Sequence, residues 1–283
     1  MKITMENACD LHIHSAPDLG ERIGNDVEIA RNCRDAGMRA IGLKCHLDTT
    51  MGRAYYTEQI VGGIKVYGGL VLNMQCGGIN PAAVDAALKF GAKLIWMPTF
   101  HSAYQVECTG KPGMFDASAG FPFRPVTILK EDGSLKEETL IICELVKKHN
   151  AILCTSHLSP GECLKLAGAA REIGLERLVI THPFFTPPAF RVEELKQACA
   201  LGAFVEFSTN CLSPLPKPID VHLYKEAVDA VGAERIIIGS DAGSPRKGFP
   251  AESIRAFAFT LGMLGVSEKD LHKMMVSNYD KLL

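Results

Sequence analysis

Short apolar runs alternate with longer segments of helical periodicity along almost the whole chain. Eight such runs cover residues 8–14, 40–46, 65–73, 93–99, 151–157, 178–182, 203–209 and 235–241. Several, such as the Ile-Ile-Ile-Gly stretch in 235–241, are almost continuously apolar, as strands covered on both faces are. Alternation of this kind is typical of βαβ units around a parallel sheet.

The segments between these runs predict amphipathic helices. They cover residues 26–36, 81–90, 136–149, 161–173, 192–201, 223–231 and 251–264. Many end at a glycine, which favours the left-handed conformation of a helix exit: Gly37, Gly91, Gly174, Gly202 and Gly232. Eight strand–helix repeats favour a closed (β/α)₈ TIM barrel, with residues 1–283 as a single domain. No Gly-x-Gly-x-x-Gly follows the first run, which argues against a dinucleotide-binding sheet.

One segment interrupts this rhythm. Residues 101–137 form a long, aromatic and glycine-bearing excursion after the fourth predicted strand. Within it, Asp132-Gly133 lies between two short strand-like stretches and predicts a hairpin turn. Long loops in compact barrels are commonly functional, so we expect a lid-like insertion over the substrate.

Composition limits the partners and the compartment. The net charge is −2, and lysine and arginine are scattered, so neither nucleic acid nor a membrane surface is expected as a partner. The ten cysteines contain no Cys-x-x-Cys and tend to lie in apolar runs, as buried thiols do. We expect no signal peptide and no transmembrane run, and therefore a cytoplasmic protein with a small-molecule substrate. Whether it forms a homo-oligomer stays open.

The first predicted strand carries a His-x-His pair, His12 and His14. Alternate strand residues share a face, so two imidazoles at this spacing are well placed to bind one metal ion. Later strands end in further polar residues, where barrel active sites are built. These are His46, His157, His182 and Asp241, with His101 just past strand four and Glu206 on strand seven. Imidazole and carboxylate groups at one barrel mouth suit a divalent cation such as zinc.

This order of residues resembles the amidohydrolase superfamily of metal-dependent hydrolases. The resemblance implies that His12, His14 and Asp241 bind metal. It also implies that His157 and His182 either complete a two-metal site or position water and substrate. A metal-activated water would attack the substrate, Asp241 would move its proton, and His182 would be a second ligand or an electrophilic helper.

The sequence departs from that family at strand four. Many two-metal members have a carboxylated lysine or a glutamate there, whereas residues 94–99 contain neither. Lys44, Cys45 and His101 are available as substitutes, and Lys44 and His46 share a strand face, so both are candidate ligands. One metal or two thus stays open, with zinc expected and manganese or iron as alternatives.

The substrate is not named by the sequence. We expect a small organic amide, lactone or ester, contacted by His101, Arg124 and Arg53 in the loops. His46 and the Gly-Ser-Asp-Ala motif at Asp241 also resemble the PHP phosphoesterase family, which makes phosphoester hydrolysis one alternative. Metal-dependent decarboxylation and a metal-binding barrel without activity are the others.

Overall fold

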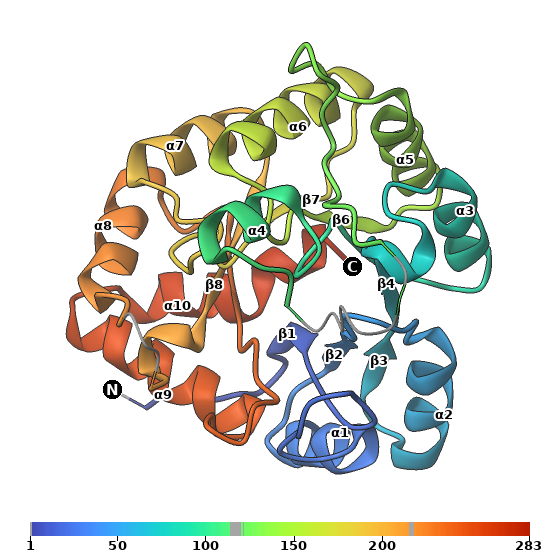
Figure 1. The fold of residues 1–283 in the computed structure, drawn as a ribbon. Coiled ribbons are helices and arrows are strands. Elements are labelled where there is room, and N and C mark those ends of the chain that lie inside the picture. Colours follow the sequence, from blue (N-terminus) through green and yellow to red (C-terminus); the bar gives the residue numbers. More distant parts are fainter. Residues whose placement is uncertain (1, 114–119, 121, 215–217) are drawn as a thin grey trace.

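A computed structural model describes residues 2–113, 120, 122–214 and 218–283. Its parallel strands lie in a three-stranded and a six-stranded sheet that together make an α/β fold of the (β/α)₈ TIM-barrel type, which confirms the predicted fold class (Figure 1). The strands are β1 Cys9–Ile13, β2 Ala40–Leu43, β3 Lys65–Tyr67, β4 Gly69–Val71, β5 Leu94–Trp96, β6 Ile152–Cys154, β7 Leu178–Thr181, β8 Phe204–Ser208 and β9 Ile236–Gly239. Beyond β9 the chain returns to β1, where Ile13 and Ala242 form a parallel bridge.

The helices lie around the outside of the strands (Figure 1). The helices are α1 Asp26–Asp35, α2 Met51–Val61, α3 Pro81–Lys89, α4 Ala103–Thr109, α5 Glu137–Lys148, α6 Pro160–Ile173, α7 Val192–Ala200, α8 Val221–Val231, α9 Pro250–Met263 and α10 Glu268–Met275. Helix α4 is the exception to the outer placement, because it lies across the barrel mouth, where Gln105 contacts His157 (Figure 1). Each predicted helix is present, and the five predicted exit glycines have positive φ. The sequence did not predict α2, α4 or α10.

The prediction of one strand over residues 65–73 is wrong, because the chain divides there into β3 and β4. Gly68 and Gly69 lie at the break, where the backbone passes very close to its neighbours. A Cβ on Gly69 would lie 2.0 Å from the Leu94 carbonyl oxygen, and one on Gly68 would lie 2.6 Å from the Thr50 backbone. Two glycines in sequence thus mark a close backbone approach rather than a continuous strand.

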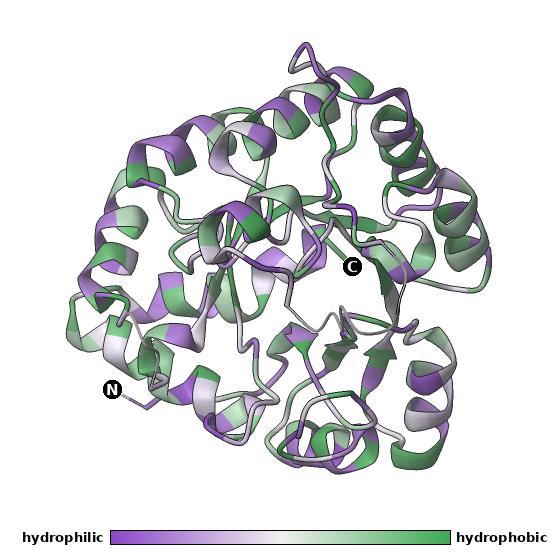
Figure 2. Cartoon of the chain, viewed as in Figure 1, coloured by the Kyte–Doolittle hydropathy of each residue, from purple (hydrophilic) through white to green (hydrophobic). Residues whose placement is uncertain are grey.

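Two apolar layers hold the barrel together. One fills the space between strands and helices, and the other fills the inside of the barrel below the histidines. Tyr279 from the C-terminal 3₁₀ helix η4 (Ser277–Lys281) joins the inner layer, where its hydroxyl donates to the Ile238 carbonyl at 2.7 Å. Figure 2 shows mostly hydrophobic strands surrounded by helices in which hydrophobic and hydrophilic residues alternate.

The excursion over 101–137 contains more regular structure than a loop. It begins with α4, and its Asp132-Gly133 turn is flanked by an antiparallel bridge between Leu129 and Leu135, which confirms the predicted hairpin. Residues 114–119 and 121 of this segment lie outside the described residues.

All ten cysteines fall among the described residues and carry free thiols; most of them are buried. In the part of the chain that the structure describes, no helix is both long and apolar enough to cross a membrane.

Candidate metal centre

His12 and His14 lie at the carboxyl end of β1 and point into the barrel mouth. The pairing of β1 with β2 is irregular between Asp10 and Ile13, and such irregularities often re-aim side chains next to active sites. The His12 Nδ1 lies 2.7 Å from the Glu206 Oε1, on β8. A carboxylate only accepts, so His12 donates from Nδ1 and presents Nε2 to the mouth. Burial opposes ionisation of Glu206, but His12 outweighs it and lowers the pKa of that carboxyl.

Asp241 follows β9 and meets both histidines with one oxygen. Its Oδ1 lies 3.2 Å from the His12 Nε2 and 3.4 Å from the His14 Nε2. Two ligand atoms bound to one tetrahedral zinc lie roughly 3.3 Å apart, given zinc–ligand distances of about 2.0–2.1 Å. Among the His, Cys, Asp and Glu side chains of the described residues, this trio brings its ligand atoms within 4.8 Å of one another. The three residues therefore fit a divalent metal ion.

The other carboxylate oxygen of Asp241 is held by its neighbours. Asn210 donates from Nδ2 to Oδ2 at 2.8 Å, and the Lys247 ammonium lies 3.3 Å from the same oxygen. Burial favours the neutral acid, but Lys247 and the two histidines outweigh it and hold the pKa of Asp241 well below its usual range. These contacts favour the ionised form of Asp241, with Oδ1 directed at the candidate metal position.

Three residues that end strands have positive φ, a backbone conformation that costs energy in residues other than glycine. They are Ser156 after β6, His182 after β7 and Asp241 after β9, with φ of 53°, 29° and 48°. Strained residues of this kind persist only where surrounding structure holds them, and they concentrate at functional sites. The strain at these strand ends supports the same site.

His157 and His182 line the mouth next to the trio. Their ring centroids are 5.2 Å apart, and the His182 ring is 5.7 Å from that of His12. Burial lowers the pKa of His182 to about 4 and that of His157 well below its usual value, so both rings are neutral. The buried His182 Nδ1 has no hydrogen-bond partner among the described residues, which leaves it available to a ligand.

His157 is oriented from the excursion rather than from the barrel. The Gln105 Oε1, on α4, lies 2.8 Å from the His157 Nδ1, and an amide oxygen can only accept. The Ser102 hydroxyl also donates to the His157 carbonyl, at 2.8 Å. The start of the expected lid therefore builds part of the site wall.

Lys44 lies inside the barrel after β2, as its spacing predicts. Its Nζ lies 3.0 Å from the His12 Nε2 and 5.7 Å from the centre of the Trp96 ring. The side chain is fully buried, and burial lowers the pKa of its ammonium. Lys44 thus stands beside the metal position.

His46 also faces the mouth. Its ring stacks on that of His14, with centroids 4.5 Å apart, and lies 4.3 Å from the Phe100 ring. The His46 Nδ1 lies 2.9 Å from the Thr99 hydroxyl. Cys45, which lies between Lys44 and His46 in the sequence, is buried.

The expected substrate contacts are in different surroundings. His101 is buried and accepts a hydrogen bond from the Met74 backbone at Nδ1, 3.1 Å away. Arg53 lies on α2 rather than in a loop, and its guanidinium binds the Asp26 carboxylate and the Ser15 and Pro17 carbonyls, so it braces the β1–α1 loop. Arg124 is exposed and lines a cavity of about 610 Å³ at the base of the excursion.

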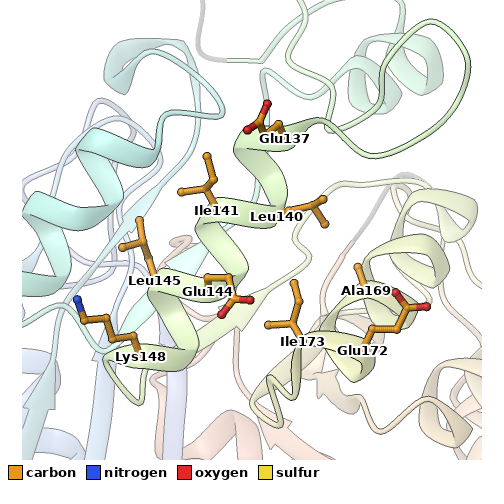
Figure 3. Close-up of a pocket in the computed structure, with 9 residues that line it drawn as sticks. All are labelled: Glu137, Leu140, Ile141, Glu144, Leu145, Lys148, Ala169, Glu172 and Ile173. Carbon is orange, nitrogen blue, oxygen red and sulfur yellow. The ribbon is translucent and has the colours of Figure 1, made fainter.

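A separate groove of about 520 Å³ lies on the outside of the molecule, between α5 and α6 (Figure 3). Its lining mixes apolar and charged side chains: Leu140, Ile141, Leu145, Ala169 and Ile173, with Glu137, Glu144, Glu172 and Lys148. None of the strand-end histidines lines it, so it is not part of the candidate metal centre.

Sequence reasoning missed Gln105, Asn210 and Lys247 and gave Glu206 no role. The sequence does indicate a role for Glu206, since a carboxylate in an otherwise apolar strand needs a partner. The other three lie in loops or in a helix that the sequence did not predict, and only the fold brings them to the site.

Comparison with solved structures defines the class of the barrel. An amidohydrolase from Pseudomonas aeruginosa is similar with a TM-score of 0.62 and 14% identity, over 99% of this chain and 98% of that chain. A beta-aspartyl dipeptidase from Fervidobacterium islandicum is similar with a TM-score of 0.65 and 12% identity, over 98% of this chain and 72% of that chain. An organophosphorus hydrolase from Deinococcus radiodurans is similar with a TM-score of 0.62 and 11% identity, over 97% of this chain and 92% of that chain.

The molecule thus has the fold of amidohydrolase-type barrels, which confirms the resemblance at the level of fold. By sequence, the chain belongs to the family of unknown function DUF6282, whose profile matches residues 7–206. A search of curated proteins gave no match.

Proposed function

We propose that this protein is a metal-dependent hydrolase of a small organic amide, lactone or ester. The observation that carries the proposal is the convergence of His12, His14 and Asp241 at distances that suit ligands of one cation. The similar solved structures include an amidohydrolase, a dipeptidase and an organophosphorus hydrolase, which supports hydrolysis without indicating the substrate.

In this proposal His12, His14 and Asp241 hold the cation, with zinc first and manganese or iron as alternatives. When bound, a divalent ion polarises the scissile bond and lowers the pKa of water. His157, His182 and Lys44 are the groups in place to hold a second ion, because they surround the first position.

Asp241 is the residue we assign to proton transfer. Its carboxylate is ionised and lies at the mouth with 18% of its side chain exposed, so it can accept a proton from the attacking water. It would return that proton to the leaving group. The neutral His182, whose Nδ1 is free of hydrogen bonds within the described structure, is placed to bind an oxygen that gains charge.

The whole chain, residues 1–283, would act as one barrel, with 101–137 covering the mouth. His101 and Arg124 remain the proposed substrate contacts from this segment. Arg53 would act indirectly, by holding the β1–α1 loop through Asp26 and Ser15.

A panel of esters, lactones, amides and phosphoesters tests the proposal on zinc- and manganese-loaded protein. We expect turnover of a carbonyl substrate by the wild type and none by Asp241→Asn, with an unchanged circular dichroism spectrum. Turnover of phosphoesters alone would favour the PHP-like alternative. Carbon dioxide release would favour decarboxylation, and metal occupancy without any turnover would favour a binding protein.

A further inference from the structure

We propose that His46 binds an oxygen of the ligand through its Nε2–H group and is not a metal ligand. The inference deepens the proposed function and rests on it, because it names what the site recognises beside the metal. It follows from which groups donate and which accept in the hydrogen bonds that hold His46.

The orientation of the Asn73 amide determines the direction of the other hydrogen bonds. Its Oδ1 accepts from the Thr99 backbone N–H at 2.9 Å, and its Nδ2 donates to the His46 carbonyl at 2.9 Å. A backbone N–H can only donate and a carbonyl can only accept, so the orientation of the amide is settled. The Asn73 Nδ2 must therefore also donate in its 2.7 Å contact with the Thr99 hydroxyl.

The Thr99 hydroxyl then has one hydrogen left to place. It is fully buried, and within the described structure its remaining neighbour at hydrogen-bond distance is the His46 Nδ1, at 2.9 Å. If His46 donated from Nδ1, the hydroxyl hydrogen would stay buried without a partner, at a cost of about 1–3 kcal/mol. The hydroxyl therefore donates, Nδ1 accepts, and the ring proton of His46 is on Nε2.

His46 differs in this respect from its neighbours at the mouth. His12 donates from Nδ1 to Glu206, and His157 donates from Nδ1 to Gln105, so in the neutral form of each ring the lone pair is on Nε2, where it can bind metal. His46 presents an N–H group, which cannot bind a cation. The barrel mouth thus carries imidazoles that can bind metal through Nε2 and one imidazole that donates a hydrogen bond from Nε2.

The surroundings of His46 define the chemistry of its ligand. Its ring stacks on that of His14, a proposed metal ligand, and its centroid lies 4.3 Å from that of Phe100, so His46 has the proposed metal ligand on one side and an aromatic ring beside it. Its Nε2 has no hydrogen-bond partner within the described part of the chain. A donor here suits a carbonyl, carboxylate or phosphoryl oxygen and disfavours an ammonium group, which has no lone pair to offer.

Nitrogen NMR of the ¹⁵N-histidine-labelled protein reads the tautomer directly, with His46→Gln used to assign the signal. We expect the protonated nitrogen of His46 to couple to both ring C–H groups, as Nε2 does, while His12 and His157 show a protonated Nδ1. A protonated Nδ1 in His46 would overturn the proposal. Thr99→Ser keeps the hydroxyl and should keep the tautomer, whereas Thr99→Val should abolish the preference; an unchanged preference in Thr99→Val would also overturn it.

Zinc and acetate, used as probes, separate this inference from the proposed function. Zinc should shift the His12 and His14 nitrogen signals and leave the His46 Nε2–H bonded to its proton. Saturating acetate should then move the His46 N–H proton signal downfield. Loss of that proton on zinc addition, or no response to acetate, would overturn the inference, whereas failure of zinc to shift His12 and His14 would instead contradict the proposed metal centre.

Discussion

At the scale of single residues, the two oxygens of Asp241 have separate partners. Oδ1 faces His12 and His14, and Oδ2 faces Asn210 and Lys247. Lys247 lowers the pKa of the carboxyl, and both contacts fix the orientation of its oxygens, so we infer that Asn210 and Lys247 are positioning residues. Partners of this kind commonly change metal affinity when they are removed.

We therefore predict that Lys247→Met weakens zinc binding by roughly 10- to 100-fold, because Asp241 loses a charge partner and the pKa of its carboxyl rises. Competition with a chromogenic chelator measures the affinity. Arg246→Met, an exposed cation in the same loop, is the matched control and should bind zinc as the wild type does. Equal affinities for the two variants would remove Lys247 from this role.

At the scale of elements, the close passage of β4 against β5 depends on glycine. A Cβ on Gly69 would lie 2.0 Å from the Leu94 carbonyl oxygen and 2.7 Å from the Trp96 ring. Neither group can move easily, because both belong to the buried barrel wall.

Gly69→Ala should accordingly lower the free energy of unfolding by about 1–3 kcal/mol or more, measured by urea titration. Gly168→Ala is the matched control, since nothing lies within 4 Å of a Cβ there and the residue is inside α6. That change should raise stability by about 1 kcal/mol, as alanine favours helix. A neutral Gly69→Ala would contradict the packing described for β4.

The elements also show where prediction from the sequence succeeds. Apolar periodicity and exit glycines located the strands and most helices, because each signal is local to its element. Spacing alone predicts that Lys44 and His46 share the inner face, and the structure brings both to the mouth.

Prediction was poorer where the relevant contact is not local. The break at Gly68 and Gly69 depends on Leu94 and Thr50, which are remote in sequence. Helix α2 has few buried side chains, Ala54, Thr57 and Val61, and so lacks a clear apolar stripe. Gln105 reaches His157 across 52 positions, a pairing that no sequence pattern indicates.

At the scale of the whole molecule, the buried thiols link stability to pH. Burial raises the pKa of Cys9 to about 11 and that of Cys143 to about 12, from an ordinary thiol value of 9.0. In the unfolded chain these thiols lose their protons above pH 9, while the folded chain keeps them. The folded state then binds more protons, so stability is lost as the pH rises.

The free energy of unfolding should thus fall above pH 9 by about 1 kcal/mol per buried thiol for each pH unit. Urea titrations at pH 7.5 and 10 under reducing conditions measure the loss. The double variant Cys9→Ala/Cys143→Ala should lose less stability over this interval than the wild type, whereas the exposed Cys108→Ala should behave as the wild type. An identical loss in all three proteins would rule out this linkage.

The central claim concerns the metal at His12, His14 and Asp241, and elemental analysis of the purified protein tests it most directly. Protein prepared without chelators should hold about one or two equivalents of a divalent metal, and the His12→Ala/His14→Ala variant should hold almost none while keeping its fold. A wild type without bound metal that also gains no thermal stability from added zinc or manganese would contradict the claim.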